Sequence, residues 1–291
     1  MNNKSYIYFL LILISLIWAS SFIVVKNATE EIDPIDLGFL RFLVATPIML
    51  LILLFRKKNI HLPKKELPSL IILGLTGVTL LYLFQYIGIS YTNASTSAVL
   101  INTNVIFIAL LSVFFLNETL PLKRILGIVL SFIGVIVVII SNLPAERFTF
   151  DNVFFIGSVL VLLSAFCWAI YSIIGKRLLK KYDTFAITTY SFALGTLFYI
   201  PLVISDLYIE IQGLSINLIM SIIYLAILCS VFGYIGWYYA LREIEASKAA
   251  VFLNLIPFFA IIMSLLYGEK ITGIFLLGAI LIIYGIYQTQ K

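Results

Sequence analysis

The sequence predicts an all-α membrane protein with ten transmembrane helices, arranged as two inverted repeats of five helices. Three observations lead to this fold class: the composition, a series of apolar runs of membrane-spanning length, and an internal repeat of rare residues. Of the 291 residues, 62% are hydrophobic and 11% are charged, and the mean hydropathy is +1.12. Because an ordinary soluble domain carries about 25% charge, a lipid bilayer is the solvent that suits this chain.

Apolar runs long enough to cross about 30 Å of hydrocarbon follow one another along the chain. Each run is bounded by charged residues, proline, asparagine or glycine, and none shows the alternating polarity of a barrel strand. The predicted spans, in order, are residues 6–25, 36–55, 67–89, 94–115, 122–141, 153–175, 184–205, 215–240, 246–267 and 272–288.

Lysine and arginine gather in alternate segments between these runs. If both termini lie on one side, the segments on that side hold fifteen Lys and Arg residues, and those on the opposite side hold three. Since basic residues concentrate on the cytoplasmic side, we expect a multi-pass cell-membrane protein with both termini in the cytoplasm. With an odd number of helices, the basic segments would no longer all lie on one side of the membrane. The lipid bilayer therefore explains the net charge of +5, and nucleic acid is not expected as a partner.

Rare residues recur at a nearly constant spacing. The matched positions, at shifts of 150 to 152 residues, include Trp18 and Trp168, Tyr82 and Tyr234, Asn102 and Asn254, and Glu118 and Glu269. We therefore divide the chain into a first repeat, 1–145, and a second, 146–291. Five spans per repeat is an odd number, so the halves insert with opposite orientations. In that architecture a midplane site is exposed to the two sides alternately, which predicts a transporter of small molecules.

Several short motifs resemble the EamA family of the drug/metabolite transporter superfamily. They are Trp18 with Ala19, Trp168 with Ala169, Leu40 to Phe42, Leu116 to Glu118, and Tyr267 to Glu269 before a glycine-rich helix. The resemblance covers nearly the whole chain. It implies ten helices, internal termini, a central cavity, and export or exchange of small metabolites, often amino acids. The family usually has a proline in the fourth and ninth helices; Pro257 fits the ninth, but the fourth has none.

Aromatic and polar side chains share single faces of the first, third, sixth and eighth predicted helices. An unpaired hydroxyl or amide is costly in hydrocarbon, so these faces should turn inward and line a cavity. An interfacial aromatic belt is the alternative, and it stays open for the two matched tyrosines. With two matched amides, the candidate substrate-binding residues are Trp18, Ser21, Tyr82, Gln85, Tyr86, Asn102, Trp168, Tyr171, Tyr234, Trp237, Tyr238 and Asn254.

The matched amides, Asn102 and Asn254, offer both donors and acceptors to a zwitterion. Hydrogen bonds between helices are the alternative use for them. Arg41 is the charged side chain well within a predicted span, and such a charge is a functional-site hypothesis by default. Snorkelling to the interface, or pairing with a loop carboxylate such as Asp36, is the alternative for Arg41.

Two structural roles are also predicted. Glu118 and Glu269 stand at helix ends, where each carboxylate suits the N-terminus of the next helix. A role in coupling transport is the alternative for both. Small residues form stripes on the fifth and tenth predicted helices, which favours close helix packing. The residues of these stripes are Gly127, Ser131, Gly134, Gly278 and Gly285.

No Asp or Glu lies deep in a predicted span, and the single histidine, His61, lies in a basic loop. We therefore expect no catalytic residue, no metal site and no cofactor, and the lack of a phosphate-binding glycine loop argues against direct ATP drive. The leading hypothesis is a secondary transporter, an exporter or exchanger of small metabolites such as amino acids. The alternatives are a ligand-binding scaffold or receptor without transport, and a small multidrug or cation exporter. Coupling and oligomeric state stay open.

Overall fold

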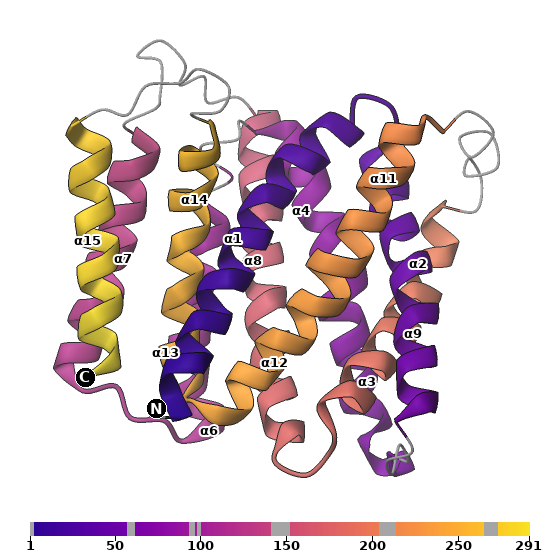
Figure 1. Cartoon of the computed structure of the whole chain (residues 1–291), viewed down its shortest axis with the longest axis horizontal. Helices are drawn as coiled ribbons and strands as arrows, with labels where there is room; N and C mark the ends of the chain where they lie inside the picture. The colour runs from indigo at the N-terminus through magenta and orange to yellow at the C-terminus, as the bar shows by residue number, and fades with distance from the viewer. Residues whose placement is uncertain are drawn as a thin grey trace.

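The computed structural model describes residues 3–56, 62–92, 97, 100–140, 152–203, 214–264 and 273–291, and these residues are helical without any strand. The helices form one bundle, with both chain termini at the same end (Figure 1). The elements are α1 (Asn3–Ala28), α2 (Pro34–Phe55), η1 (Lys64–Glu66), α3 (Leu67–Gly74), η2 (Leu75–Thr79), α4 (Leu80–Tyr91), α6 (Asn104–Leu116), α7 (Leu122–Ile140), α8 (Asn152–Leu179), α9 (Thr184–Val203), α11 (Ile216–Tyr224), η3 (Leu225–Phe232), α12 (Gly233–Glu243), α13 (Ala246–Ala250), η4 (Val251–Asn254), α14 (Leu255–Ser264) and α15 (Gly273–Gln290).

Seven helices within the described ranges are long and apolar enough to cross a membrane. They are Ser5–Val25, Pro34–Phe55, Lys64–Tyr91, Asn152–Leu179, Thr184–Val203, Ile216–Glu243 and Gly273–Gln290. Two shorter apolar helices, Leu100–Leu116 and Ala246–Ala260, fall in the predicted fourth and ninth spans, and α7 falls in the fifth. Each predicted span therefore overlaps at least one helix of the structure.

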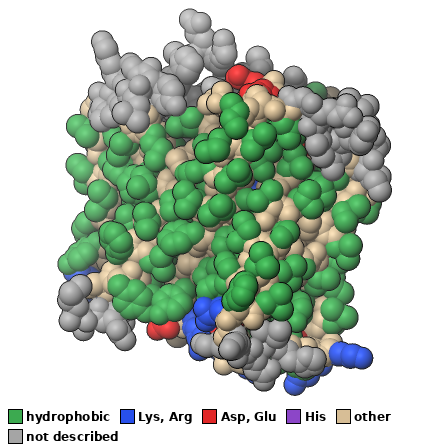
Figure 2. Space-filling model, turned by 45° about the vertical axis from the view of Figure 1, so that its right-hand side comes forward, with side chains coloured by type: hydrophobic (Ala, Val, Ile, Leu, Met, Phe, Trp, Pro, Cys, Tyr) green, Lys and Arg blue, Asp and Glu red, His purple; other side chains and the backbone are tan. Residues whose placement is uncertain are grey.

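The outer surface of the bundle is apolar. Large side chains such as Phe55 and Phe114 are 81% and 75% exposed, and hydrophobic side chains cover the face shown in Figure 2. Described Lys and Arg side chains gather at the lower end of that face, which is the end of the two termini in Figure 1. Since exposed apolar surface on this scale needs lipid around it, the chain is a multi-pass membrane protein.

The predicted close packing of small residues is confirmed where α7 meets α15. A Cβ added at Gly134 would lie 2.7 Å from the nitrogen of Ile282, and one at Gly285 would lie 2.5 Å from the nitrogen of Ser131. Real Cβ atoms do not approach a backbone that closely, so only glycine lets these two helices touch. This contact joins the last predicted helix of each half.

Two of the long spans change their helical type near the middle. α3 continues through the π-helical segment η2 into α4, and α11 continues through the π-helical segment η3 into α12. A π-helical turn is wider than an α-helical turn, and such turns often mark functional sites. The two segments begin at Leu75 and Leu225, which lie 150 residues apart.

Candidate functional site

A cavity of about 110 Å³ lies among α1, α2, α4, α6, α8, α12, η4 and α14. One water molecule needs roughly 10–15 Å³, so the cavity has room for a small solute. Its lining includes the second half of α1, from Trp18 to Val25, and the start of α6. Because α1 rises from the end with the termini (Figure 1), the cavity extends from the middle of the bundle toward the opposite end.

Four pairs of repeat-related residues are in direct contact beside this cavity. The pairs are Trp18 and Trp168, Phe42 and Phe192, Thr46 and Thr196, and Tyr82 and Tyr234. The two indoles meet edge to face with 5.2 Å between ring centroids, and the two phenyl rings do the same at 5.0 Å. The threonine hydroxyls are 2.8 Å apart, and the tyrosine hydroxyls are 3.1 Å apart. Matched positions of the repeat therefore meet at the centre of the bundle.

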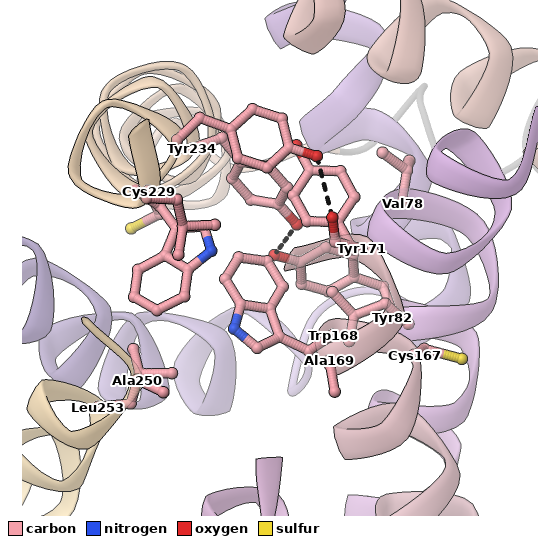
Figure 3. Close-up of a cluster of buried hydrophobic side chains, with 14 of the residues drawn as sticks. Val78, Tyr82, Cys167, Trp168, Ala169, Tyr171, Cys229, Tyr234, Ala250 and Leu253 are labelled. Atoms are coloured by element: carbon pink, nitrogen blue, oxygen red, sulfur yellow. Dashed lines mark hydrogen bonds between the residues drawn. The ribbon is translucent and has the colours of Figure 1, made fainter. Parts of the chain in front are cut away.

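The aromatic wall is fixed by bonds to the π-helical segments. Trp18 Nε1 donates to the carbonyl oxygen of Cys229 in η3 at 3.0 Å, and Tyr234 Oη donates to the carbonyl oxygen of Gly77 in η2 at 2.7 Å. Each carbonyl oxygen has two lone pairs, so it can accept a side-chain bond besides any bond within its helix. Figure 3 shows Tyr234, Tyr82, Tyr171 and Trp168 gathered in one cluster. These bonds hold the rings of Trp18 and Tyr234 in a set orientation.

Arg41 is the one charged side chain among the described residues that line the cavity. It is 3% exposed, its Nε donates to Ser230 Oγ at 2.5 Å, and its Cζ lies 4.6 Å from the centroid of the Tyr82 ring. None of the ion pairs found within the described ranges involves Arg41. The guanidinium therefore lies on the cavity wall and does not snorkel to the membrane interface.

Two buried polar atoms on the cavity wall have no hydrogen-bond partner within the described part of the chain. Asn104 and Tyr86 are 7% and 5% exposed, and Asn104 Oδ1 and Tyr86 Oη have no partner among the described residues. Leaving a buried polar atom unpaired costs about 1–3 kcal/mol, so such atoms need an explanation. A bound solute with complementary groups would supply the missing bonds.

Seven of the candidate residues predicted from sequence line the cavity. They are Trp18, Ser21, Tyr82, Gln85, Tyr86, Trp168 and Tyr234. Three others, Tyr171, Trp237 and Tyr238, pack behind this wall and are fully buried. The rings of Tyr171 and Tyr238 stack with 4.7 Å between centroids, and Trp237 Nε1 donates to Ser172 Oγ at 3.1 Å.

The two matched amides do not line the cavity. Asn254 is fully buried in η4, and its Nδ2 donates to Ser131 Oγ on α7 at 2.7 Å, which is the hydrogen bond between helices considered above. Asn102 is 3% exposed and precedes α6. Asn104, two residues later, takes the place on the wall that the sequence assigned to Asn102.

Sequence reasoning also missed the apolar part of the wall. Phe22, Leu81, Leu253 and Ile256 lie on it, as does Ala165. Phe22 and Ala165 each lie within a turn of a predicted tryptophan, so the helical spacing could have found them. Leu253 and Ile256 flank the change from the 3₁₀ segment η4 to α14, and no pattern in the sequence marks that change.

Glu118 connects elements of both halves at the end of the bundle near the termini. Asn117 takes a left-handed conformation with φ of 55° after α6, which asparagine tolerates, and Glu118 follows it. Glu118 Oε1 accepts from the nitrogen of Ala246 at 2.6 Å, and Oε2 accepts from the nitrogen and hydroxyl of Ser247 at 3.1 and 2.9 Å. The predicted helix N-terminus is therefore that of α13 and not that of the next helix along the chain. Glu269, its repeat partner, lies outside the described residues.

Lys176 of α8 completes this contact. Its Nζ lies 3.4 Å from Glu118 Oε1 and donates to the carbonyl oxygen of Ile244. Burial of the Glu118 carboxyl opposes its ionisation, but Lys176 and the donors at the start of α13 outweigh that effect, so the pKa of Glu118 lies below its ordinary value. The carboxylate thus stays ionised at neutral pH and ties the end of α6 to α8 and α13.

Comparison with known proteins gives one family. The model of the EamA-like transporter family matches residues 5–140 and again residues 155–289. An uncharacterized transporter of Archaeoglobus fulgidus is 39% identical over 291 residues, which cover 99% of this chain and 98% of that protein. A probable amino-acid metabolite efflux pump of Salmonella typhimurium is 28% identical over 290 residues, with 96% and 93% covered. One solved crystal structure, 16% identical, has the same fold with a TM-score of 0.80 over 98% of this chain and 96% of that one.

Proposed function

This chain belongs to the EamA-like transporter family, and from that premise we propose that it is a secondary transporter that exports or exchanges small metabolites such as amino acids. The observation that carries the proposal is the cavity at the centre of the bundle, whose wall joins side chains from both halves of the chain. The probable amino-acid metabolite efflux pump among its relatives favours the same class of substrate.

We further propose that residues 1–145 and 146–291 form inverted repeats of five transmembrane helices each. Support comes from the family model, which matches once in each half, and from the contacts between repeat partners, because only residues beside a twofold axis can touch their own partners. The helix contacts also follow this symmetry. α1 packs on α12 and α14, and its counterpart α8 packs on α4 and α6.

With the termini in the cytoplasm, as the distribution of basic residues favours, the cavity lies in the outer half of the bundle. The contact of Glu118 with α13 and Lys176 then holds the inner end together. This arrangement suits an outward-facing conformation in a cycle of alternating access, in which the inner ends of the two halves separate to release or load substrate on the other side. The substrate would contact the predicted residues that line the cavity, with Trp18 and Trp168 at its centre.

Counterflow in proteoliposomes tests the proposal. Vesicles preloaded with unlabelled amino acids should accumulate a labelled amino acid faster than empty vesicles or vesicles without protein. Trp168→Ala should lower this flux at least tenfold, because the indole forms part of the cavity wall. Phe155→Ala serves as the matched control, since this ring is 69% exposed on the outer surface and its removal should leave flux unchanged.

The outcome also separates the alternatives. Saturable binding without flux of any solute would favour a receptor or binding scaffold. Flux of organic cations without flux of amino acids would favour a small multidrug or cation exporter. Equal flux by the wild type and Trp168→Ala would contradict the assignment of the cavity as the transport site.

A further inference from the structure

Resting on the proposed transport function, we propose that Arg41 is the residue that selects the substrate and that the transported solute carries a single carboxylate. The cavity wall holds one positive charge from the described side chains and no carboxylate to balance it. Removing a charge from water is costly unless a partner of opposite charge compensates it. A solute that brings a carboxylate supplies that partner.

The geometry leaves part of the guanidinium for such a solute. Nε is occupied by Ser230 Oγ, whose hydroxyl also donates to the carbonyl oxygen of Leu225 at 3.0 Å. Nε is the nitrogen of Arg41 whose hydrogen bond is found within the described ranges, and the hydroxyls of Tyr82 and Tyr86 lie beside the guanidinium. Because a guanidinium offers paired N–H donors in one plane, it matches the two oxygens of a carboxylate. Tyr82, whose ring faces Cζ, holds the charge in position through its π-electrons.

The charge balance favours a carboxylate over a phosphate. A phosphate monoester carries nearly two negative charges at neutral pH, and the described wall supplies one positive charge. One negative charge would then stay uncompensated in a buried site. The charge balance also disfavours a simple organic cation, because Arg41 would repel that cation without screening by water.

An unpaired amide oxygen on the wall suits the amine of an amino acid. Asn104 Oδ1 has no donor among the described residues. It can accept from an ammonium group, and the faces of Trp18 and Trp168 attract a cation in a dry site. The apolar side chain of the solute would then pack on Leu253 and Ile256.

Matched ligand trios test this proposal on the purified full-length protein. Each trio contains an amino acid, the same molecule without its amine, and the same molecule without its carboxylate. For leucine these are leucine, 4-methylpentanoate and 3-methylbutylamine, and equivalent trios are built on phenylalanine and threonine. Binding is measured by tryptophan fluorescence, since Trp18 and Trp168 lie on the cavity wall, and by thermal shift.

We expect at least one trio in which the amino acid and the carboxylate bind and the amine does not. Arg41→Gln should weaken carboxylate binding about thirtyfold or more, as expected when one partner of a buried charge pair is removed, and Arg41→Lys should restore part of it. Thr46→Val is the control for damage to α2, because it removes a buried hydrogen bond to Thr196 outside the cavity wall. It should lower thermal stability without selective loss of carboxylates.

Three results would overturn the proposal: amines that bind as tightly as carboxylates, carboxylate binding that Arg41→Gln leaves intact, and no binding by any carboxylate. A different result would contradict the proposed function. Carboxylate binding without counterflow would contradict transport but agree with the role of Arg41. Counterflow limited to amines would agree with transport but contradict the role of Arg41.

Discussion

In the alternating-access cycle proposed above, replacement of Glu118 by glutamine should shift the balance between the outward-facing and the inward-facing conformation. In the structure the carboxylate accepts three hydrogen bonds from the start of α13 and lies 3.4 Å from Lys176 Nζ. A glutamine amide can accept at one end, but its NH₂ end would face N–H donors and an ammonium group. The contact joins the end of α6 to α8 and α13, so in the proposed cycle it would be lost when this end of the bundle opens.

The structure sets the size of the effect. The side chains of Glu118 and Lys176 are 6% and 13% exposed, so this pair is close to a buried one. Removing one partner of a buried pair costs about 3–5 kcal/mol. Taking about 3 kcal/mol, because the pair lies near the edge of the membrane, the ratio of the two conformations should change roughly 150-fold.

Cysteine labelling measures this ratio. The two buried free thiols, Cys167 and Cys229, are replaced by alanine, and Gln85→Cys places a thiol on the cavity wall. A membrane-impermeant maleimide, added on the side opposite the termini, should label the Glu118→Gln protein more slowly, by up to the roughly 150-fold change in the ratio. Glu243→Gln is the control, because this residue is exposed at the end of α12 and should leave labelling unchanged. Equal labelling rates with and without Glu118→Gln would refute the reasoning.

Three further predictions concern stability. Gly285→Val should lower the free energy of unfolding of the detergent-solubilised protein by about 1–3 kcal/mol or more through overpacking. Gly273→Ala should leave it unchanged, since nothing lies within 4 Å of an added Cβ there. Equal losses in the two variants would contradict the assigned contact between α7 and α15. The pKa of Glu118 is lowered below its ordinary 4.5. The contribution of its carboxylate to the free energy of unfolding is therefore complete above pH 4.5 and is lost as the pH falls through the lowered pKa. Below about pH 4.5 the wild type should lose stability on acidification, and Glu118→Gln should remove this loss. Tyr234→Phe removes the donor to Gly77 and should cost about 1 kcal/mol in the same unfolding assay; no change would show that the bond is not needed.

The sequence predicted the helical class and the central aromatic pairs because both depend on patterns that survive without coordinates. The shift of 150 residues identifies Trp18 and Trp168 as partners. The same shift relates Phe42 to Phe192, whose ring centroids lie 5.0 Å apart, but sequence reasoning did not single out this pair. Apolar residues are so common in this chain that a matched pair of phenylalanines carries little signal.

The part of the site that sequence reasoning missed depends on where helices begin. α6 starts at Asn104 after the turn residue Thr103, and a shift of two residues in a helix turns a side chain to nearly the opposite face. Spacing alone therefore could not choose between Asn102 and Asn104. Arg41 was recognised as unusual, but its depth allowed both an inward and an outward orientation. Only the position of Ser230 on another helix decides between them.

The π-helical segments also carry information about ancestry. Leu75–Thr79 and the start of Leu225–Phe232 occupy the same position in their halves, and a wide turn of this kind holds one residue more than an α-helical turn. If both halves descend from one five-helix unit, that unit already contained the extra residue before duplication. Deleting a single residue within either segment would then restore an unbroken α-helix and shift the face that the rest of the span turns to the cavity.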